Sequence, residues 1–181
     1  MPDRRVVVTG LGILSPVGNE IELSWKNLLE GSSPVKEISY FDTSNYETKF
    51  AASLPEFNAE KYLEKKEIRR LDPFIQYGLA SSQECINDSG LDLNKENLTR
   101  IGVSIGSGIG GLGMIEENAL ILDKSGNKRI SPFFVPGSII NMVSGYASIK
   151  FGLRGPNISI ASACSSASHS IGYSYRSIVH G

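Results

Sequence analysis

A cysteine that follows a short apolar run carries the clearest chemical signal in this sequence. Residues 157–160 have a strand-like pattern, and small residues separate them from a helix predicted to begin at Cys164. Ala161, Ser162 and Ala163 are small enough for a sharp turn that directs the next side chain outward, as in a nucleophile elbow. A helix N-terminus also favours the thiolate form of a thiol. We predict that Cys164 is a nucleophile, although a lone cysteine beside small residues is more often a packing residue.

A nucleophilic thiol needs a base or groups that stabilise an oxyanion. The chain contains two histidines. His169 lies five residues after Cys164, which places it about 140° around a helix from the thiol. His180 lies at the far end of the same predicted helix. The sequence thus offers no catalytic base, disfavours a Cys–His protease, and predicts a packing or hydrogen-bonding role for His169.

Two glycine-rich stretches suggest a dinucleotide site but lack its other features. Residues 106–111 have the G-x-G-x-x-G spacing, and residues 10–12 follow the first predicted strand. A Rossmann site also needs an acidic residue at the end of the next strand, about 20 positions on. A helix and a polar loop follow the first stretch, and Ser15-Pro16 follows the second. We interpret these glycines as sites where backbone packs closely or bends over a pocket.

Composition excludes several classes of protein. The chain has 181 residues, 40% of them hydrophobic, which suits one globular domain with a core. A net charge of −1 does not support nucleic-acid binding, and no apolar run is long enough to span a membrane. Two cysteines do not form a disulfide framework, which favours a reducing cytoplasm. We expect Cys85, in the middle of a predicted helix, to pack in the core.

Strands and helices are predicted to alternate along the chain. We predict strands at 5–9, 100–105 and 157–161, and helices at 21–29, 59–66, 73–89, 112–122, 137–151 and 164–180. Residues 32–58 contain turn signals and are predicted to be irregular or short-stranded. Asp72 followed by Pro73 is typical of a helix N-cap and N1 position. Alternation with buried apolar strands predicts a parallel α/β sheet.

Six motifs, distributed along the whole chain, resemble the motifs of one family and occur in the same order. They are RRVVVTGLG (4–12) with SPVGN (15–19), DPFIQYG (72–78), IGSGIGGL (105–112), ISPFFVP (130–136) and FGLRGPN (151–157), ahead of the cysteine. In this order they resemble the N-terminal part of the elongating, type II β-ketoacyl-acyl-carrier-protein synthases, the condensing enzymes of fatty-acid synthesis. Ser162 departs from the threonine that is usual in the family.

The resemblance implies a thiolase-like fold, in which two similar five-stranded α/β halves pack together. Residues 1–181 would be the N-terminal β-ketoacyl synthase domain: a mostly parallel sheet flanked by helices, truncated after the nucleophile helix and lacking its final strand. The second half would supply two catalytic histidines, a lysine and a second oxyanion donor. We therefore expect that these 181 residues alone do not catalyse turnover.

The resemblance also implies the chemistry. An acyl group would pass from acyl-carrier protein to Cys164, and the carbanion from decarboxylated malonyl-acyl-carrier protein would then attack it. The backbone N–H of Cys164 would belong to the oxyanion hole. Ile109, Ala163 and Phe134 match positions that line the acyl pocket, Phe134 reaching it from the partner in a homodimer. An acyl tail needs such an apolar wall. No metal ion or cofactor is expected.

Basic residues match the family's docking surface for the acidic carrier protein. They are Lys66, Arg69, Arg70, Lys128 and Arg129. Without the resemblance, solvated surface charge would be the better interpretation.

Two alternatives to a condensing enzyme remain. One is a non-catalytic partner such as the chain-length factors, which characteristically lack the cysteine. The other is a truncated remnant that binds a full-length homologue.

Overall fold

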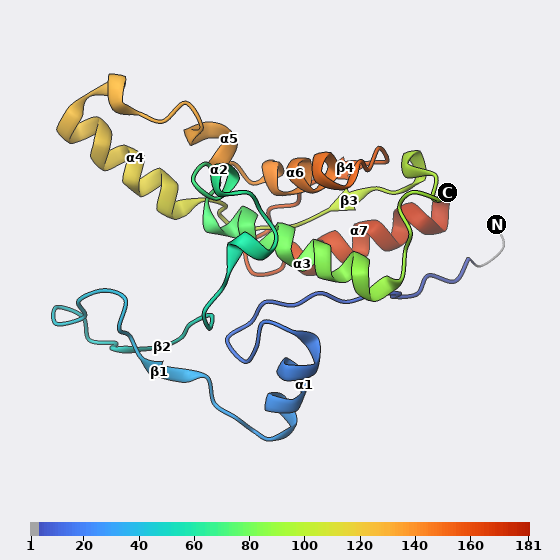
Figure 1. The fold of residues 1–181 in the computed structure, drawn as a ribbon, viewed down its shortest axis with the longest axis horizontal. Coiled ribbons are helices and arrows are strands. Elements are labelled where there is room, and N and C mark those ends of the chain that lie inside the picture. The colour runs from blue at the N-terminus through green and yellow to red at the C-terminus, as the bar shows by residue number, and fades with distance from the viewer. Residues whose placement is uncertain (1–3) are drawn as a thin grey trace.

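The computed structural model describes residues 4–181 (Figure 1). Its helices and strands are α1 (Ile21–Leu29), β1 (Val35–Glu37), β2 (Phe50–Ala52), η1 (Ala59–Lys61), α2 (Lys65–Ile68), α3 (Pro73–Ser89), η2 (Leu98–Arg100), β3 (Val103–Ser104), α4 (Leu112–Ser125), η3 (Asn127–Arg129), α5 (Phe134–Ser138), α6 (Asn141–Phe151), β4 (Asn157–Ile158) and α7 (Ser166–His180). The β3–β4 ladder contacts α6, β3 also contacts α7, and α3 packs on α6. These elements form the body of the fold.

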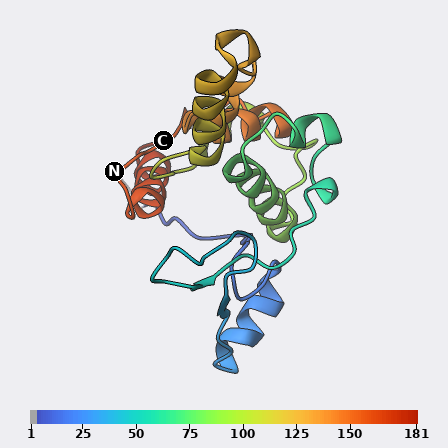
Figure 2. The same ribbon diagram turned by 90° about the vertical axis from the view of Figure 1, so that its left-hand side faces the viewer.

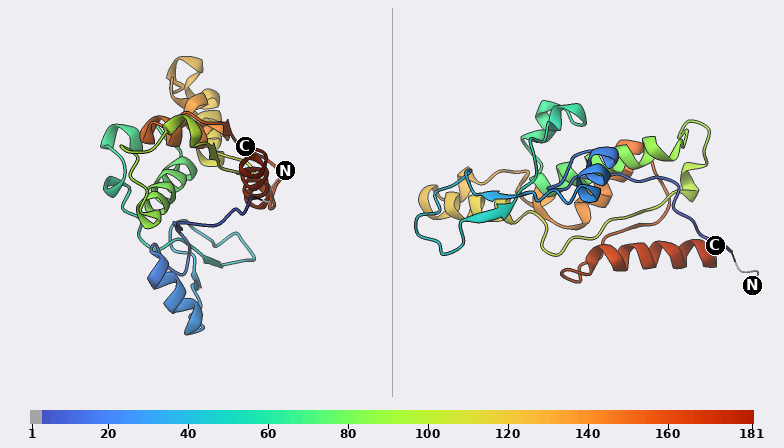
Figure 3. Two further views of the ribbon diagram at one scale, coloured as in Figure 1. Left: turned by 90° about the vertical axis from the view of Figure 1, so that its right-hand side faces the viewer. Right: turned by 90° about the horizontal axis from the view of Figure 1, so that it is seen from below.

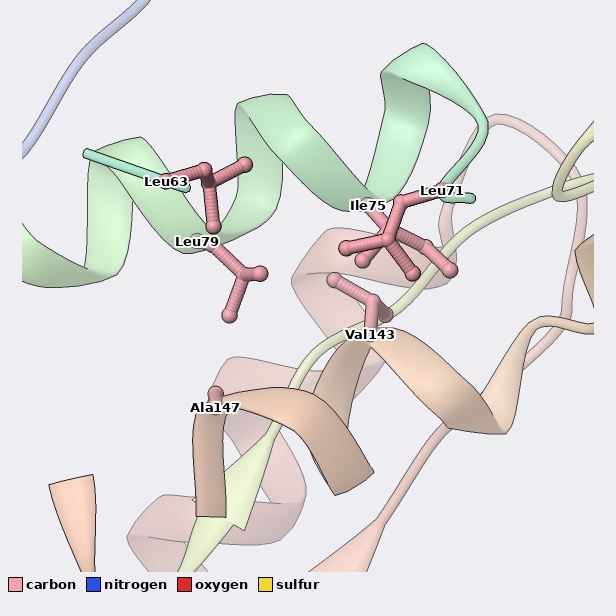
Figure 4. Close-up of a cluster of buried hydrophobic side chains, with 6 residues drawn as sticks. All are labelled: Leu63, Leu71, Ile75, Leu79, Val143 and Ala147. Atoms are coloured by element: carbon pink, nitrogen blue, oxygen red, sulfur yellow. The ribbon is translucent and has the colours of Figure 1, made fainter. Parts of the chain in front are cut away.

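The hydrophobic core lies mainly between α3 and α6 (Figure 4). Ile75 and Leu79 of α3 face Val143 and Ala147 of α6, and each of the four is at most 2% exposed. Gly78 permits this close approach, because a Cβ there would lie 2.4 Å from Val143 Cγ2. The core is therefore centred on one tight helix pair.

The ends of α3 follow the signals in the sequence. The Asp72 carboxylate accepts a hydrogen bond from the Phe74 N–H at 3.1 Å, and Pro73 occupies the first turn. Gly90 ends the helix in the left-handed region, with φ 68°. The predicted helix at 73–89 is confirmed at both ends because these caps act locally.

The parallel pairing is confirmed, but the strands are shorter than predicted. Val103 pairs with Asn157 in the parallel β3–β4 ladder. Within residues 4–181 the structure holds two separate two-stranded sheets, so the five-stranded sheet is not formed there. The second sheet is the antiparallel β1–β2 pair, which confirms short strands within residues 32–58.

The predicted strand at 5–9 is wrong, because the segment runs extended without a ladder partner. Its neighbours are helices rather than strands. Arg4 donates to the Ile178 carbonyl at 2.6 Å, and the Leu11 N–H donates to the Asp88 carboxylate at 2.8 Å. A Cβ at Gly12 would lie 2.0 Å from the Ser81 carbonyl oxygen, so the chain lies directly on α3.

Two predicted helices are each divided in the structure. The helix expected at 59–66 becomes η1 and α2, because the Glu64 side chain caps α2 in a capping box with Glu67. The helix expected at 137–151 becomes α5 and α6, separated at Ile139, which is extended with ψ 143°. The helix expected at 112–122 is confirmed and extends to Ser125.

The chain exposes much more surface than a compact protein of its size. Its accessible area is 12,470 Å², whereas a compact protein of 19.6 kDa exposes about 8,600 Å². Figures 2 and 3 show the reason: α4 and the α1–β2 region project from the body as separate arms. Exposed apolar side chains include Ile171 on α7 and Leu29 on α1, at 71% and 70%. None of the helices in residues 4–181 has the length and apolar composition to cross a membrane.

Candidate active site

Cys164 lies exposed on a sharp turn between β4 and α7. Ala163, immediately before it, has φ 52° and is the one non-glycine residue between 4 and 181 in the left-handed region. Such a conformation costs about 1–2 kcal/mol for a residue with a Cβ, and strain of this kind concentrates at functional sites. The helix begins at Ser166, two residues later than predicted. The turn itself has the outward-directed form expected of a nucleophile elbow.

Ser166 holds the two sides of this turn together. Its buried hydroxyl accepts a hydrogen bond from the Ser162 N–H at 2.9 Å and donates to the Ala163 carbonyl at 2.6 Å. The Ser166 N–H also donates to that carbonyl, at 3.1 Å. These bonds stabilise the strained residue from both sides, so the first residue of α7 fixes the position of Cys164.

His169 on α7 forms a hydrogen bond with Ser162, which lies in the elbow before the helix. Its Nδ1 lies 2.6 Å from Ser162 Oγ. The Ser165 hydroxyl donates to the Ser162 carbonyl at 2.7 Å, on the same side of the elbow. The expectation of a hydrogen-bonding role for His169 is confirmed, and the departure from threonine at position 162 preserves the hydroxyl that makes the bond.

The glycine loop at 106–111 passes beside the elbow. A Cβ at Gly106 would lie 2.4 Å from the Ser166 carbonyl oxygen, and one at Gly108 would lie 3.4 Å from the Ala163 carbonyl oxygen. The interpretation that these glycines permit close backbone packing is therefore confirmed. Ile109 follows directly and is 64% exposed. The structure thus places Ile109 on a loop that touches the cysteine turn.

Phe134 begins α5, whose other end is hydrogen-bonded to the glycine loop. The Gly111 N–H donates to the Ser138 carbonyl at 2.8 Å, and the Ser138 hydroxyl donates to the Phe134 carbonyl at 2.7 Å. Phe134 itself is half-buried. Within one chain, the glycine loop and α5 are therefore joined, whereas the approach of Phe134 from a partner subunit stays a prediction.

Cys85, the second thiol, occupies a different environment. It lies half-buried on α3, where its Sγ donates to the Gly10 carbonyl at 3.4 Å. Burial, and then the nearby Asp88 carboxylate, raise the pKa of the Cys85 thiol. A higher pKa means less thiolate at neutral pH, so the structure gives Cys85 the character of a packing residue.

The five basic residues fall into two groups that the structure keeps apart. Lys66, Arg69 and Arg70 lie on or next to α2, whereas Lys128 and Arg129 lie in η3. Figures 1 and 2 show η3 at the outer end of the α4 arm, away from α2. Lys66 Nζ lies 2.7 Å from an exposed Glu64 carboxylate, whose hydrogen bond raises the pKa of Lys66.

Sequence reasoning missed a contact of Arg70. Its guanidinium carbon lies 4.2 Å from the centre of the Phe133 ring, in a cation–π arrangement. Phe133 precedes Phe134 and caps α5. Arg70 therefore links the α2 basic group to the segment that carries Phe134, through a pair far apart in the sequence that no local pattern indicates.

Side chains that could ligate a metal ion form no cluster within residues 4–181. Between residues 4 and 181, no three His, Cys, Asp or Glu side chains are grouped so that they could hold a metal ion. The chemistry that the arrangement can supply is nucleophilic attack by an exposed thiol on a rigid turn.

Comparison with known proteins shows the family of this chain. A family model described as "Beta-ketoacyl synthase, N-terminal domain" matches residues 3–181. The 3-oxoacyl-[acyl-carrier-protein] synthase 2 of Vibrio cholerae is 52% identical over 181 residues, which are all of this chain and 44% of that protein. The chain therefore spans less than half the length of this curated relative.

Two solved structures share the fold. "The ishigamide ketosynthase/chain length factor" superimposes with a TM-score of 0.90 at 22% identity, covering 99% of this chain and 45% of that one. A type II polyketide ketosynthase in complex with its acyl-carrier protein, "AntDE:AntF (apo)", gives 0.82 at 24% identity, covering 97% and 47%. Identities this low establish the fold alone. The family model, which matches residues 3–181, establishes the family: this chain belongs to the β-ketoacyl synthases, whose N-terminal domain it carries.

Proposed function

We propose that residues 1–181 act as one domain, the acyl-accepting half of an enzyme that elongates fatty acids by decarboxylative condensation. The observation that carries the proposal is the exposed Cys164 on a strained elbow, in a domain of this family. The chain spans 44% of its relative, so the activity requires groups beyond those described here.

Cys164 is the proposed catalytic nucleophile. Its thiolate attacks the carbonyl of an acyl-carrier-protein thioester, a new C–S bond forms, and the carrier thiol leaves and takes up a proton. In the second half-reaction, malonyl-acyl-carrier protein loses CO₂, and the resulting carbanion displaces Cys164 from the acyl carbon. The backbone N–H of Cys164 is proposed to stabilise the oxyanion in both steps.

Ile109, Ala163 and Phe134 are the proposed acyl-pocket residues. Ile109 and Ala163 are supported by the contact between the glycine loop and the elbow. Phe134 is proposed to reach this pocket from the partner subunit of a homodimer. We place this dimer in the cytoplasm, which agrees with two unpaired thiols.

Acyl-carrier protein is the proposed partner, docking on Lys66, Arg69, Arg70, Lys128 and Arg129. All five lie in exposed, positively charged segments, and a ketosynthase of the same fold is known in complex with its own acyl-carrier protein. Because the two basic groups lie apart, one carrier protein would bridge both only by spanning from α2 to η3. Such complementarity mainly raises the association rate and weakens with salt.

A second candidate function is a subunit without turnover that packs on a full-length homologue. The large exposed apolar surface favours it, whereas the intact Cys164 favours the enzyme. The two are separated by supplying acyl- and malonyl-acyl-carrier protein to a full-length synthase containing these residues and measuring CO₂ release. The enzyme proposal predicts release and elongated product that Cys164→Ala abolishes and Cys85→Ala preserves. Product in Cys164→Ala, or none in the unmodified enzyme, would overturn it.

A further inference from the structure

All the polar groups of Ser162, in the elbow, are hydrogen-bonded to the first turn of α7 or to its cap. The Ser162 N–H donates to the Ser166 hydroxyl at 2.9 Å. Its carbonyl accepts from the Ser165 hydroxyl at 2.7 Å and from the Ser165 N–H at 3.2 Å. Its own hydroxyl lies 2.6 Å from Nδ1 of His169. His169 therefore makes the short contact that holds the side chain of Ser162.

The residue between Ser162 and Cys164 is the strained one. Ala163 has φ 52°, a conformation that a residue with a Cβ avoids. Ser166 binds the backbone on both sides of it, at the Ser162 N–H and at the Ala163 carbonyl. His169 adds the bond to the Ser162 side chain. Because a strained residue keeps its conformation only while its surroundings determine it, each of these bonds opposes the relaxation of Ala163.

The elbow positions the backbone N–H of Cys164 as well as its thiol. The N–H groups of Ser165 and Ser166 donate to carbonyls within the turn, whereas no acceptor within residues 4–181 takes the N–H of Cys164. The direction of this N–H turns with the backbone angles of Ala163, and an oxyanion donor is effective only when it is aimed in advance. A small rotation at Ala163 would therefore affect the N–H more than the exposed thiol, which also rotates about its own side-chain bonds.

We propose that His169 is a positioning residue for Cys164: by binding the Ser162 hydroxyl it helps to hold Ala163 in the left-handed conformation, and so aims the Cys164 N–H at the oxyanion of the acyl thioester. The inference rests on the proposed acyl-accepting function of Cys164. His169 acts only through Ser162 and does not touch the acyl group.

Paired substitutions separate the hydrogen bond from the bulk of the two side chains. His169→Phe keeps a ring but removes Nδ1, and Ser162→Ala removes the hydroxyl. His169→Asn restores a polar group near the position of Nδ1, and Ser162→Thr keeps the hydroxyl. Since an amide is not a base, rescue by His169→Asn also excludes proton transfer by the ring. His180→Phe is the matched control, because His180 is the exposed last residue of the same helix.

The assay compares two reactions of Cys164 in a full-length synthase that contains these residues. Acylation by octanoyl-acyl-carrier protein passes through an oxyanion, whereas alkylation by iodoacetamide needs only an accessible thiolate. In His169→Phe and in Ser162→Ala, acylation is expected to fall about fivefold relative to alkylation, the scale of one net hydrogen bond. The double variant should fall no further than either single variant, because both remove the same bond. His169→Asn, Ser162→Thr and His180→Phe should keep the ratio of the unmodified enzyme.

An unchanged ratio in the two single variants, an additive loss in the double variant, or no rescue by His169→Asn would overturn the proposal. A parallel fall of acylation and alkylation would also overturn it, because it would assign the bond a general role in folding.

Amide hydrogen exchange provides a readout that does not depend on acylation. In His169→Phe and in Ser162→Ala, exchange should accelerate at 162–166 while the rest of α7 remains protected, and His180→Phe should leave the elbow unchanged. Unchanged exchange at the elbow in the first two variants would refute the positioning role itself. Accelerated exchange there, in an enzyme whose unmodified form acquires no acyl group on Cys164, would instead refute the function on which the inference rests, so the two failures are distinguishable.

Discussion

Replacing Gly78 by alanine is expected to strain the contact between α3 and α6 and so to destabilise the fold. The same replacement is expected to stabilise the fold once Val143 has been shortened to alanine. The added Cβ would lie 2.4 Å from Val143 Cγ2, well inside the carbon–carbon optimum of about 3.5–4.0 Å. Overpacking costs about 1–3 kcal/mol, and the higher helix propensity of alanine offsets about 1 kcal/mol. Gly78→Ala alone should therefore destabilise by about 1 kcal/mol.

Val143→Ala removes two methyl groups from a side chain that is 1% exposed, at an expected cost of about 2 kcal/mol. In this background the new Cβ of Gly78→Ala occupies the space left by Cγ2, so it should stabilise by about 1 kcal/mol. The coupling between the two sites is then about 2 kcal/mol, within the range for residues in contact.

The assay is amide hydrogen exchange of α3 and α6 in a full-length synthase that contains them, which measures the free energy of opening of these helices. Gly145→Ala in α6 is the matched control. A Cβ there meets nothing closer than Met142 Sδ at 3.8 Å, so this change should stabilise by about 0.5–1 kcal/mol. Additive effects of Gly78→Ala and Val143→Ala would refute the account of the core.

Three further predictions concern the thiols, the basic surface and one tyrosine. Iodoacetamide should label the exposed Cys164 before Cys85, and the labelling of Cys85 should accelerate with pH because its thiol pKa is raised. Peptide mass spectrometry checks the order, and faster labelling of Cys85 would contradict the prediction. In a full-length synthase, reversing Lys66 and Arg69 to Glu should raise the KM for acyl-carrier protein and leave acylation by a small thioester nearly unchanged; equal losses with both substrates would assign these residues a structural role. Burial and a hydrogen bond to a neighbouring glutamate raise the pKa of Tyr62 to about 12, so the stability that this group contributes is complete below its unfolded value near 10 and is lost between pH 10 and 12. Tyr62→Phe should lessen this alkaline loss in pH-dependent unfolding, and an unchanged pH profile would refute the assignment.

Local signals in the sequence predicted helices well. The Asp72-Pro73 start and the Gly90 end of α3 act over one turn, and both are where they were expected. The strand at 5–9 was wrong because a strand depends on a neighbour distant in sequence, and helices lie beside this segment instead. The division of the helix predicted at 137–151 follows from the extended Ile139, which no helix-breaking signal at that position indicates.

The candidate site was predictable in its nucleophile and less so in its support. Small residues before Cys164 indicated the turn, and the structure adds the strain at Ala163 that the sequence does not reveal. The stacking of Arg70 on Phe133 and the bond from Met114 to Asp72 join segments more than 40 residues apart. Such contacts depend on how the helices pack, which is why periodicity and capping signals gave no indication of them.

The most direct test of the central claim is to find where an acyl group becomes attached. Acyl-acyl-carrier protein is incubated with a full-length synthase that contains these residues, and the products are analysed by intact-protein and peptide mass spectrometry, with Cys164→Ala and Cys85→Ala as matched variants. The account predicts one acyl group per chain on the Cys164 peptide, released by hydroxylamine, absent in Cys164→Ala and retained in Cys85→Ala. An acyl group on another residue, or one that persists in Cys164→Ala, would contradict it.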